Sequence, residues 1–497
     1  MPRTFFAIAV LLCGSAAAQR QTTWQRKHNA TLIQSPTGFV EVEWLSASTF
    51  RFQRCSSATC PSRPGVKDAI DFTVRDTGPA IEFRTEYLTA QFRKPAGTMF
   101  VQTNRGKVLL DELPLNGPPL AGIGFDRASP PGERLYGLGP RTSLQLDLRG
   151  SRVKASRPLL IASTGYGQYF SSPAVYEFDL AQAAPDRVQV RAVLTTRLEY
   201  FFYYGPTPKE ILEEHVMVTG AISPISPALV SFLRPGTLPK YAVTVPPLPL
   251  AETVAWLNHA SFSGVAAPAV DLGTFPDPLG AYLPLVFGPA RAPRERFMPY
   301  LYTYLQEARD RGLPVFRPLA MQYANDGEAA RHPDTFMIGD EILIGSGPKT
   351  YLPMGIWTHL RDGAVYKGRQ IIDTPQGPGP GPALFCHNGT ILPVENADRS
   401  LSLHYFPRLG AEFFLSEPGH DLPTQVHAAP AADLLRLQIE SRVDREYEWI
   451  VHHVSPIVRI EPTRPFTYDT ASRTLRLRTR AAAGSDVIIH VSLEEPL

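Results

Sequence analysis

The chain has 497 residues, 43% of them hydrophobic, and a formal net charge of +2. At roughly 100–200 residues per domain, this length predicts two to four domains. The nearly balanced charge, with no Lys/Arg run interleaved with aromatic residues, argues against a nucleic-acid partner.

Residues 1–18 have the pattern of a signal peptide. Arg3 gives a positive start, residues 5–12 form an apolar run, and three alanines precede Gln19. The run is too short for a bilayer, which needs about 20 apolar residues, and no later segment is apolar enough for a membrane helix. We therefore expect an exported protein, periplasmic or extracellular, that is cleaved near Ala18 and has no membrane partner.

The cysteines are interpreted for an oxidising compartment. Cys55 and Cys60 close a short loop between strand-like stretches, and a disulfide is favoured over a metal site because no nearby His or Cys offers further ligands. Cys386 is left over and is expected to be buried in a strand. A lipoprotein signal at Cys13 is disfavoured because Leu12 stands where a small residue is expected.

Residues 19–225 are predicted to form an N-terminal β-sandwich. Val40, Val42 and Trp44 alternate with glutamates, the period of a half-buried antiparallel strand. The stretch ends in a helix that begins after Thr207, the predicted N-cap, and stops at Gly220.

In residues 226–335 the sequence pattern changes from alternating residues to helical stretches separated by short apolar runs. Helical stretches at 251–262 and 294–311 alternate with short apolar runs at 228–233, 264–272 and 315–319. Strands that alternate with helices are typical of βα units around a parallel sheet. There are only three or four such units, so we expect a truncated (β/α) barrel.

Strands return after residue 335. We expect a proximal C-terminal β-sandwich over residues 336–422 and a distal β domain over residues 423–497, where Leu435, Leu437 and Ile439 alternate with polar residues. The predicted fold class is mainly β with an α/β remnant of about half of the eight barrel units.

Three groups of motifs together resemble glycoside hydrolase family 31, the α-glucosidase and α-xylosidase family. The first group lies in the sandwich, at residues 133–139, 146–150 and 158–167. The second is Tyr203-Tyr204-Gly205-Pro206-Thr207-Pro208-Lys209-Glu210 with Thr219-Gly220. The third comprises Met298-Pro299-Tyr300-Leu301-Tyr302, residues 312–319, residues 336–340 and residues 351–357. The resemblance covers most of residues 30–420 and implies a mutarotase-like sandwich, a (β/α)8 barrel and two C-terminal β-sandwiches.

The resemblance also shows what is missing. A retaining glycosidase needs two carboxylates about 5–5.5 Å apart. The family's nucleophile segment, Trp-x-Asp-Met-x-Glu on the fourth barrel strand, has no counterpart here, because residues 220–231 replace well over a hundred residues of the family. The acid/base position falls on Leu248 or a neighbouring proline, and the family's Arg-Asn-His is Phe287-Gly288-Pro289. Leu248 and its proline neighbours cannot carry a proton, and the replaced Arg-Asn-His is the family's element that holds the sugar hydroxyls.

Two sugar-contacting positions of the family are matched. Arg234 follows the fifth strand and Asp271 stands in the Gly-x-Asp-Ile-Gly-Gly-Phe element. They are either inherited scaffold residues or a pair that hydrogen-bonds one sugar, and Asp271 is a weak catalytic candidate because a neighbouring arginine would keep it ionised.

Three hypotheses follow for a carbohydrate-directed protein without cofactors. The first is an inactive relative that retains carbohydrate binding. The second is an active α-glycosidase with a rebuilt site, in which Asp271 acts with Asp277 or Glu252. The third is a decayed gene product.

The half barrel leaves two open edges. We expect a monomer whose remnant packs on its own sandwiches, with a homodimer through the open edge as the alternative.

No metal site is predicted. His452 and His453 are adjacent on a predicted strand, so their side chains should point to opposite faces and cannot share a metal.

Overall fold

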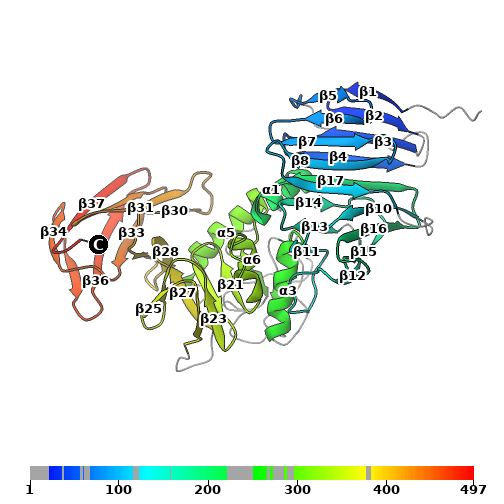
Figure 1. The fold of residues 1–497 in the computed structure, drawn as a ribbon. Coiled ribbons are helices and arrows are strands. Elements are labelled where there is room, and N and C mark those ends of the chain that lie inside the picture. The colour runs from blue at the N-terminus through cyan, green and yellow to red at the C-terminus, as the bar shows by residue number, and fades with distance from the viewer. Residues whose placement is uncertain are drawn as a thin grey trace, which may run out of the picture.

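The computed structural model describes residues 22–35, 38–55, 60, 68–115, 122–156, 158–220, 250–265, 269–271, 285–287, 296–375 and 382–496. Two β-rich lobes lie at opposite ends of the molecule, and most of the helices lie between them (Figure 1). The predicted fold class, mainly β with an α/β remnant, is confirmed.

The N-terminal lobe contains two antiparallel sheets. The eight-stranded sheet has the order β1 (Thr23–Lys27), β2 (Ala30–Ser35), β3 (Gly38–Trp44), β4 (Thr49–Cys55), β17 (Arg197–Tyr204), β14 (Tyr166–Tyr169), β13 (Leu159–Ala162), β11 (Leu135–Gly137). The nine-stranded sheet has the order β12 (Ser151–Ser156), β15 (Val175–Leu180), β16 (Arg187–Val193), β10 (Gly122–Ala128), β9 (Val108–Leu113), β8 (Thr98–Thr103), β7 (Leu88–Arg93), β6 (Ala80–Arg84), β5 (Thr73–Asp76). One continuous apolar core, which includes the stacked rings of Phe50 and Phe202, joins the two sheets. Cys55 and Cys60 form a disulfide.

The alternation of β3 does not leave one face in water. Glu41 and Glu43 are as buried as a core residue because both carboxylates bind the buried guanidinium of Arg51, at 2.6 and 2.7 Å. The sequence pattern predicted a half-buried strand, which was wrong here. Because an ion pair compensates for the burial of charged side chains, both faces of this strand can be covered. The alternation of residue types in the sequence does not show that such a pair will form.

Helices connect the two lobes. They are α1 (Pro208–Thr219), α3 (Leu250–Phe262), α5 (Met298–Arg311), the short α6 (Leu319–Gln322) and a 3₁₀ turn, η2 (Ala329–Arg331). The predicted start of α1 is confirmed, since Glu210 accepts a hydrogen bond from the backbone N–H of Thr207 at 2.8 Å. The end of α5 is set by Gly312, which adopts a left-handed conformation (φ 71°) that glycine tolerates best.

Within the described residues, the barrel remnant is one parallel pair, β18 (Ala269–Asp271) and β19 (Leu285–Phe287). The apolar run at 228–233 lies outside the described residues. The run at 315–319 was expected to be a barrel strand, and this was wrong. Its strand β20 (Phe316–Pro318) pairs antiparallel with β21 (Thr335–Ile338) in a different sheet.

That sheet is six-stranded and antiparallel. Its order is β20, β21, β22 (Ile342–Gly345), β27 (Ala383–His387), β24 (Ile356–His359), β25 (Val365–Lys367), and β23 (Lys349–Leu352) pairs separately with β26 (Gln370–Asp373).

The distal lobe consists of two five-stranded sheets. The first has the order β28 (Thr390–Glu395), β29 (Leu401–Phe406), β33 (Arg445–Val451), β36 (Thr474–Ala481), β35 (Phe466–Asp469). The second has the order β30 (Ala411–Leu415), β31 (Thr424–Ala431), β32 (Leu434–Glu440), β37 (Asp486–Leu493), β34 (Ile457–Glu461). Because strands before residue 422 pair with strands after it, the expected boundary at 422/423 falls inside this lobe. The strand pairing places the division near residue 389 instead.

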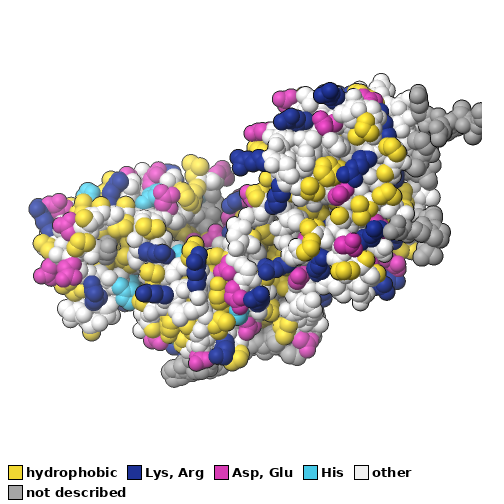
Figure 2. Space-filling view, in the orientation of Figure 1, with side chains coloured by type: hydrophobic (Ala, Val, Ile, Leu, Met, Phe, Trp, Pro, Cys, Tyr) yellow, Lys and Arg dark blue, Asp and Glu magenta, His cyan; other side chains and the backbone are white. Residues whose placement is uncertain are grey.

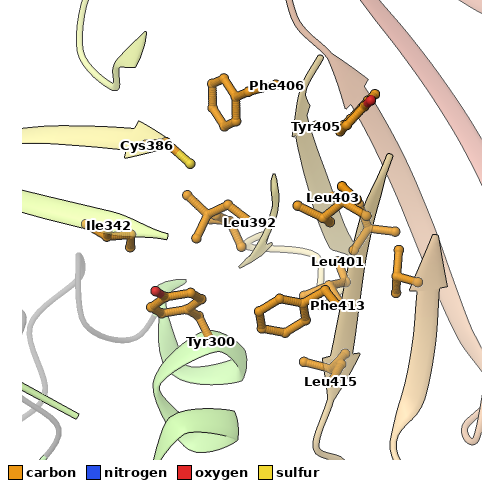
Figure 3. Close-up of a cluster of buried hydrophobic side chains, with 14 of the residues drawn as sticks. Tyr300, Ile342, Cys386, Leu392, Leu401, Leu403, Tyr405, Phe406, Phe413 and Leu415 are labelled. Carbon is orange, nitrogen blue, oxygen red and sulfur yellow. The ribbon is translucent and has the colours of Figure 1, made fainter. Parts of the chain in front are cut away.

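The helix α5 is part of the core of the distal lobe. Tyr300 of α5 stacks on Phe413 of β30, with ring centroids 6.0 Å apart, and lies among the aliphatic side chains of β28 and β29 (Figure 3). Cys386 is buried at the edge of the same cluster. The helix that follows the barrel remnant is therefore held by the sheets that follow it in the chain.

Candidate functional site

The structure places only part of the predicted sugar site. Arg234, Leu248 and Asp277 lie outside the described residues. Asp271 is the last residue of β18, and the parallel register sets it opposite Phe287 of β19. These two positions meet at the carboxyl end of the strand pair, the edge where barrel enzymes place their functional groups. Phe287, the residue paired with Asp271 at this edge, has no polar side-chain group that could bind a sugar hydroxyl or transfer a proton.

Glu252 was the other carboxylate proposed for a rebuilt site. It lies in the first turn of α3, and its side chain is exposed. Residues 253–262 of α3 are buried and fixed by polar contacts: Asn258 donates to Pro333 O at 2.7 Å, and Ser261 donates to Phe316 O at 2.8 Å. These contacts hold α3 against the six-stranded sheet, at β20 and at the residue pair that precedes β21.

An ionic network around a buried arginine lies where α1, α5 and the six-stranded sheet meet. Arg317 has a fully buried side chain and bridges the carboxylates of Glu307 on α5 and Asp340 after β21. Asp340 also accepts hydrogen bonds from Lys209 of α1 at 2.8 Å and Gln322 of α6 at 2.6 Å. Burial alone would raise the pKa of Asp340, but the charges of Arg317 and Lys209 outweigh it and hold the pKa well below its ordinary value.

The neighbouring residue Glu341 has the opposite environment. Its side chain is buried, and Tyr300 and Tyr304 both donate to Oε2, at 2.9 and 2.6 Å. Burial, together with the charge of Asp340, raises the pKa of Glu341 to about 7.

Two carboxyl groups with pKa values driven apart are what acid/base catalysis needs. Asp340 and Glu341 line a cleft of about 900 Å³ between α5 and β30. Both are engaged by scaffold groups, however: the tyrosines of α5 hold Glu341, which is 8% exposed, and residues of two helices and one strand hold Asp340. We interpret this network as structural: it holds α1 and α5 against the six-stranded sheet.

His452 and His453 do not lie on a strand, which corrects the sequence prediction. Both follow the end of β33, and His453 has a positive φ of 54°. His452 Nε2 lies 3.0 Å from His404 Nδ1 on β29. Sequence reasoning missed this pair because 48 residues separate its members, and only the pairing of β29 with β33 brings them together.

The remaining site classes can be examined over the same described ranges. No group of three or more His, Cys, Asp or Glu side chains there is arranged to hold a metal ion. None of the helices in this part of the chain is long and apolar enough to cross a membrane.

Comparison with known proteins gives three kinds of match. Residues 312–392 match the family model described as the glycosyl hydrolase family 31 C-terminal domain. An alpha-glucosidase of Saccharolobus solfataricus is 28% identical over 109 residues, covering 20% of this chain and 15% of that protein. A probable glucan 1,3-alpha-glucosidase of Arabidopsis thaliana is 32% identical over 119 residues, covering 22% and 13%. The matched part thus spans a small fraction of these relatives.

Solved structures match over nearly the whole chain. The Flavobacterium johnsoniae family 31 dextranase, in a mutant form complexed with isomaltotriose, superposes with a TM-score of 0.77 at 12% identity, covering 95% of this chain and 99% of that one. A Listeria monocytogenes protein in complex with glucose gives a TM-score of 0.77 at 13% identity, covering 95% and 76%. At these identities the likeness is one of fold.

Proposed function

We propose, from the premise that this chain belongs to glycoside hydrolase family 31, that it is a carbohydrate-binding member without hydrolytic activity. The relatives place it among proteins of carbohydrate metabolism. Loss of hydrolysis and retention of binding are the two parts of the proposal.

The replacement of the acid/base position carries the first part. Leu248 and its proline neighbours stand where the family has its Trp-x-Gly-Asp-Asn, and the segment with the nucleophile has no counterpart. General acid catalysis typically contributes 10²–10⁴-fold, and without a nucleophile no glycosyl-enzyme intermediate can form. The two losses are of different kinds, one a deletion and one a substitution, so a single sequence accident does not account for both.

The second part rests on Asp271 and Arg234. The register sets Asp271 at the carboxyl end of β18, which is where a barrel protein presents a sugar-binding carboxylate. A carboxylate and a guanidinium can together accept from and donate to adjacent hydroxyls of one sugar. The dextranase and the Listeria protein were solved with isomaltotriose and glucose respectively, which makes a neutral α-glucan the first ligand to test.

The test combines hydrolysis with binding. We expect the purified full chain to release no product from aryl α-glucosides or α-xylosides, and to bind isomaltotriose in calorimetry. Asp271→Asn should weaken that binding at least tenfold, whereas Asp433→Asn, an exposed carboxylate in the distal lobe, should leave it unchanged. Product release that Asp271→Asn abolishes would overturn the proposal.

An active α-glycosidase with a rebuilt site is the second candidate. The observation that favours it is the retained strand-end carboxylate, Asp271, with Glu252 exposed on α3. An inverting mechanism needs two carboxyl groups about 6.5–9.5 Å apart. Parallel loss of turnover in Asp271→Asn and Glu252→Gln would establish this candidate, and the absence of turnover in the unaltered chain would end it.

We also infer that the protein is exported and works as a monomer. The pattern of residues 1–18 and the Cys55–Cys60 disulfide fit an oxidising compartment. Fractionation of the source cells tests export, and light scattering tests the monomer against a dimer formed through the barrel edge.

A further inference from the structure

A second cleft, of about 640 Å³, lies between the six-stranded sheet and the distal lobe. Its volume is within the range of about 300–1,000 Å³ that small-molecule sites occupy. The turn between β24 and β25, the start of α5, and strands β29 and β36 each contribute to its wall. Figure 2 shows several Lys and Arg side chains gathered on this face, where β27 and β28 lie in Figure 1.

Three arginines give the cleft its charge. Arg296 precedes α5, Arg361 lies in the β24–β25 turn, and Arg476 lies on β36; all three side chains are exposed. The described part of the chain offers none of them a salt-bridge or hydrogen-bond partner. Three guanidinium groups from distant parts of the sequence therefore line one cavity. Among the described residues no hydrogen bond or salt bridge occupies their donors, although the charge of Arg476 acts on Asp469.

The two carboxylates that line the cleft are already occupied. Asp362 accepts from the backbone N–H of Ala364 at 2.9 Å and lies 2.7 Å from His359 Nδ1. Asp469 accepts from Ser472 Oγ at 2.7 Å and from the backbone N–H of Ala471 at 2.9 Å. Both carboxylates serve local turns, and the three arginines still outnumber them, so the cleft has a net positive charge.

The histidine pair adds a donor that can adapt to a ligand. Burial lowers the pKa of His404 to about 4 and that of His452 to about 3, so both are neutral near pH 7. Their mutual hydrogen bond uses one nitrogen of each ring. Whichever ring donates, the two outer nitrogens are one donor and one acceptor, and moving both protons exchanges these roles. An acceptor on a ligand therefore selects the arrangement that turns a donor toward it.

We propose that this cleft binds an anionic saccharide, one that bears a carboxylate or a sulfate group. The planar guanidinium of arginine matches such oxyanions with two parallel hydrogen bonds. The half-buried Phe297 and Leu360 supply apolar wall for the C–H faces of a sugar ring. That the anion belongs to a saccharide rests on the proposed function, whereas the anionic character rests on the cleft alone.

Calorimetry of the full chain with three probes tests the proposal: a uronic-acid trisaccharide, a neutral trisaccharide of the same size, and sodium sulfate. We expect the acidic trisaccharide to bind at least tenfold more tightly than the other two. Its affinity should fall at least tenfold in the double variant Arg361→Ala/Arg476→Ala. The matched control is Arg480→Ala, an exposed arginine on the same strand β36 but outside the cleft, and it should bind within twofold of the unaltered chain.

Four results would overturn this proposal: no binding of the acidic probe at millimolar concentration, equal binding of the neutral probe, equal binding of sulfate, or full binding by the double variant. Neutral-glucan binding that is lost in Asp271→Asn and kept in the double variant belongs to the barrel remnant. The two proposals therefore fail independently.

Discussion

The buried carboxyl group of Glu341 predicts an unusual dependence of stability on pH. Its pKa is raised from an ordinary value of 4.5 to about 7, because burial and the charge of Asp340 outweigh the hydrogen bonds from the two tyrosines. The folded protein therefore holds a proton that the unfolded chain releases between pH 4.5 and 7. Over this window the unfolded state binds fewer protons, so the contribution of Glu341 to stability falls as pH rises.

The size of the effect follows from the pKa difference. The folded pKa of about 7 lies about 2.5 above the ordinary value, and at about 1.4 kcal/mol for each factor of ten this corresponds to about 3 kcal/mol, fully expressed only above pH 7. In Glu341→Gln this titration is absent, while the amide oxygen can still accept from Tyr304. Any cost of placing the amide NH₂ does not vary with pH.

Denaturant unfolding of both proteins at pH 5, 6, 7 and 8 measures this. We expect the free energy of unfolding of Glu341→Gln, relative to the unaltered chain, to rise by about 2.5 kcal/mol between pH 5 and pH 8, because part of the full difference is already present at pH 5. Glu446→Gln, an exposed glutamate on β33, controls for the loss of one negative charge. A difference that stays constant within about 0.5 kcal/mol over this range would refute the reasoning.

Three further predictions concern stability. Arg317→Ala leaves two carboxylates without their buried cation and should cost about 3 kcal/mol, at the lower end for a buried ion pair because those carboxylates are partly exposed; a change below about 1 kcal/mol in denaturant unfolding would contradict this. The double variant Cys55→Ser/Cys60→Ser opens a disulfide that spans only five positions and should lose about 2 kcal/mol, and a reducing agent should then no longer lower its melting temperature. Gly339→Ala places a Cβ against the tyrosines of α5 at a positive φ and should cost about 2–4 kcal/mol. Gly363→Ala, which also has a positive φ but open space around it, should cost about 1 kcal/mol, and equal losses in the two would show that crowding plays no part.

Much of the fold could be predicted from local patterns. Alternating residues located β32, and the Thr207 and Gly220 signals located both ends of α1. These features are determined by residues that are close in the sequence. The predictions were wrong where a contact between residues far apart in the sequence determines which sheet a strand joins. The short apolar run of β20 looked like a barrel strand, but antiparallel pairing with β21 places it in the next sheet.

The same limit applies to candidate sites. A family motif could point to Asp271, because its neighbours in the sequence match. The histidine pair could not be predicted, since His404 and His452 meet only through the parallel pairing of β29 and β33. The arginines of the second cleft come from three separate segments, and an exposed arginine in a sequence has no signature of the cavity that it faces.

A chain that retains only part of a barrel still needs something to hold its two β lobes together. The structure supplies this through helices that the barrel shares with its neighbours. The stacked rings of Tyr136 and Phe262, 4.4 Å apart, join β11 to the end of α3, and Tyr300 buries α5 in the distal lobe. Arg317 and Asp340 then connect α5 to α1. All of these contacts lie in the N-terminal sandwich, the connecting helices and the C-terminal sheets, so the two lobes are joined without a complete barrel. The residues that hold this scaffold together are thus separate from Asp271, the candidate sugar-binding carboxylate, so the stability of the scaffold does not depend on whether the chain hydrolyses a glycoside.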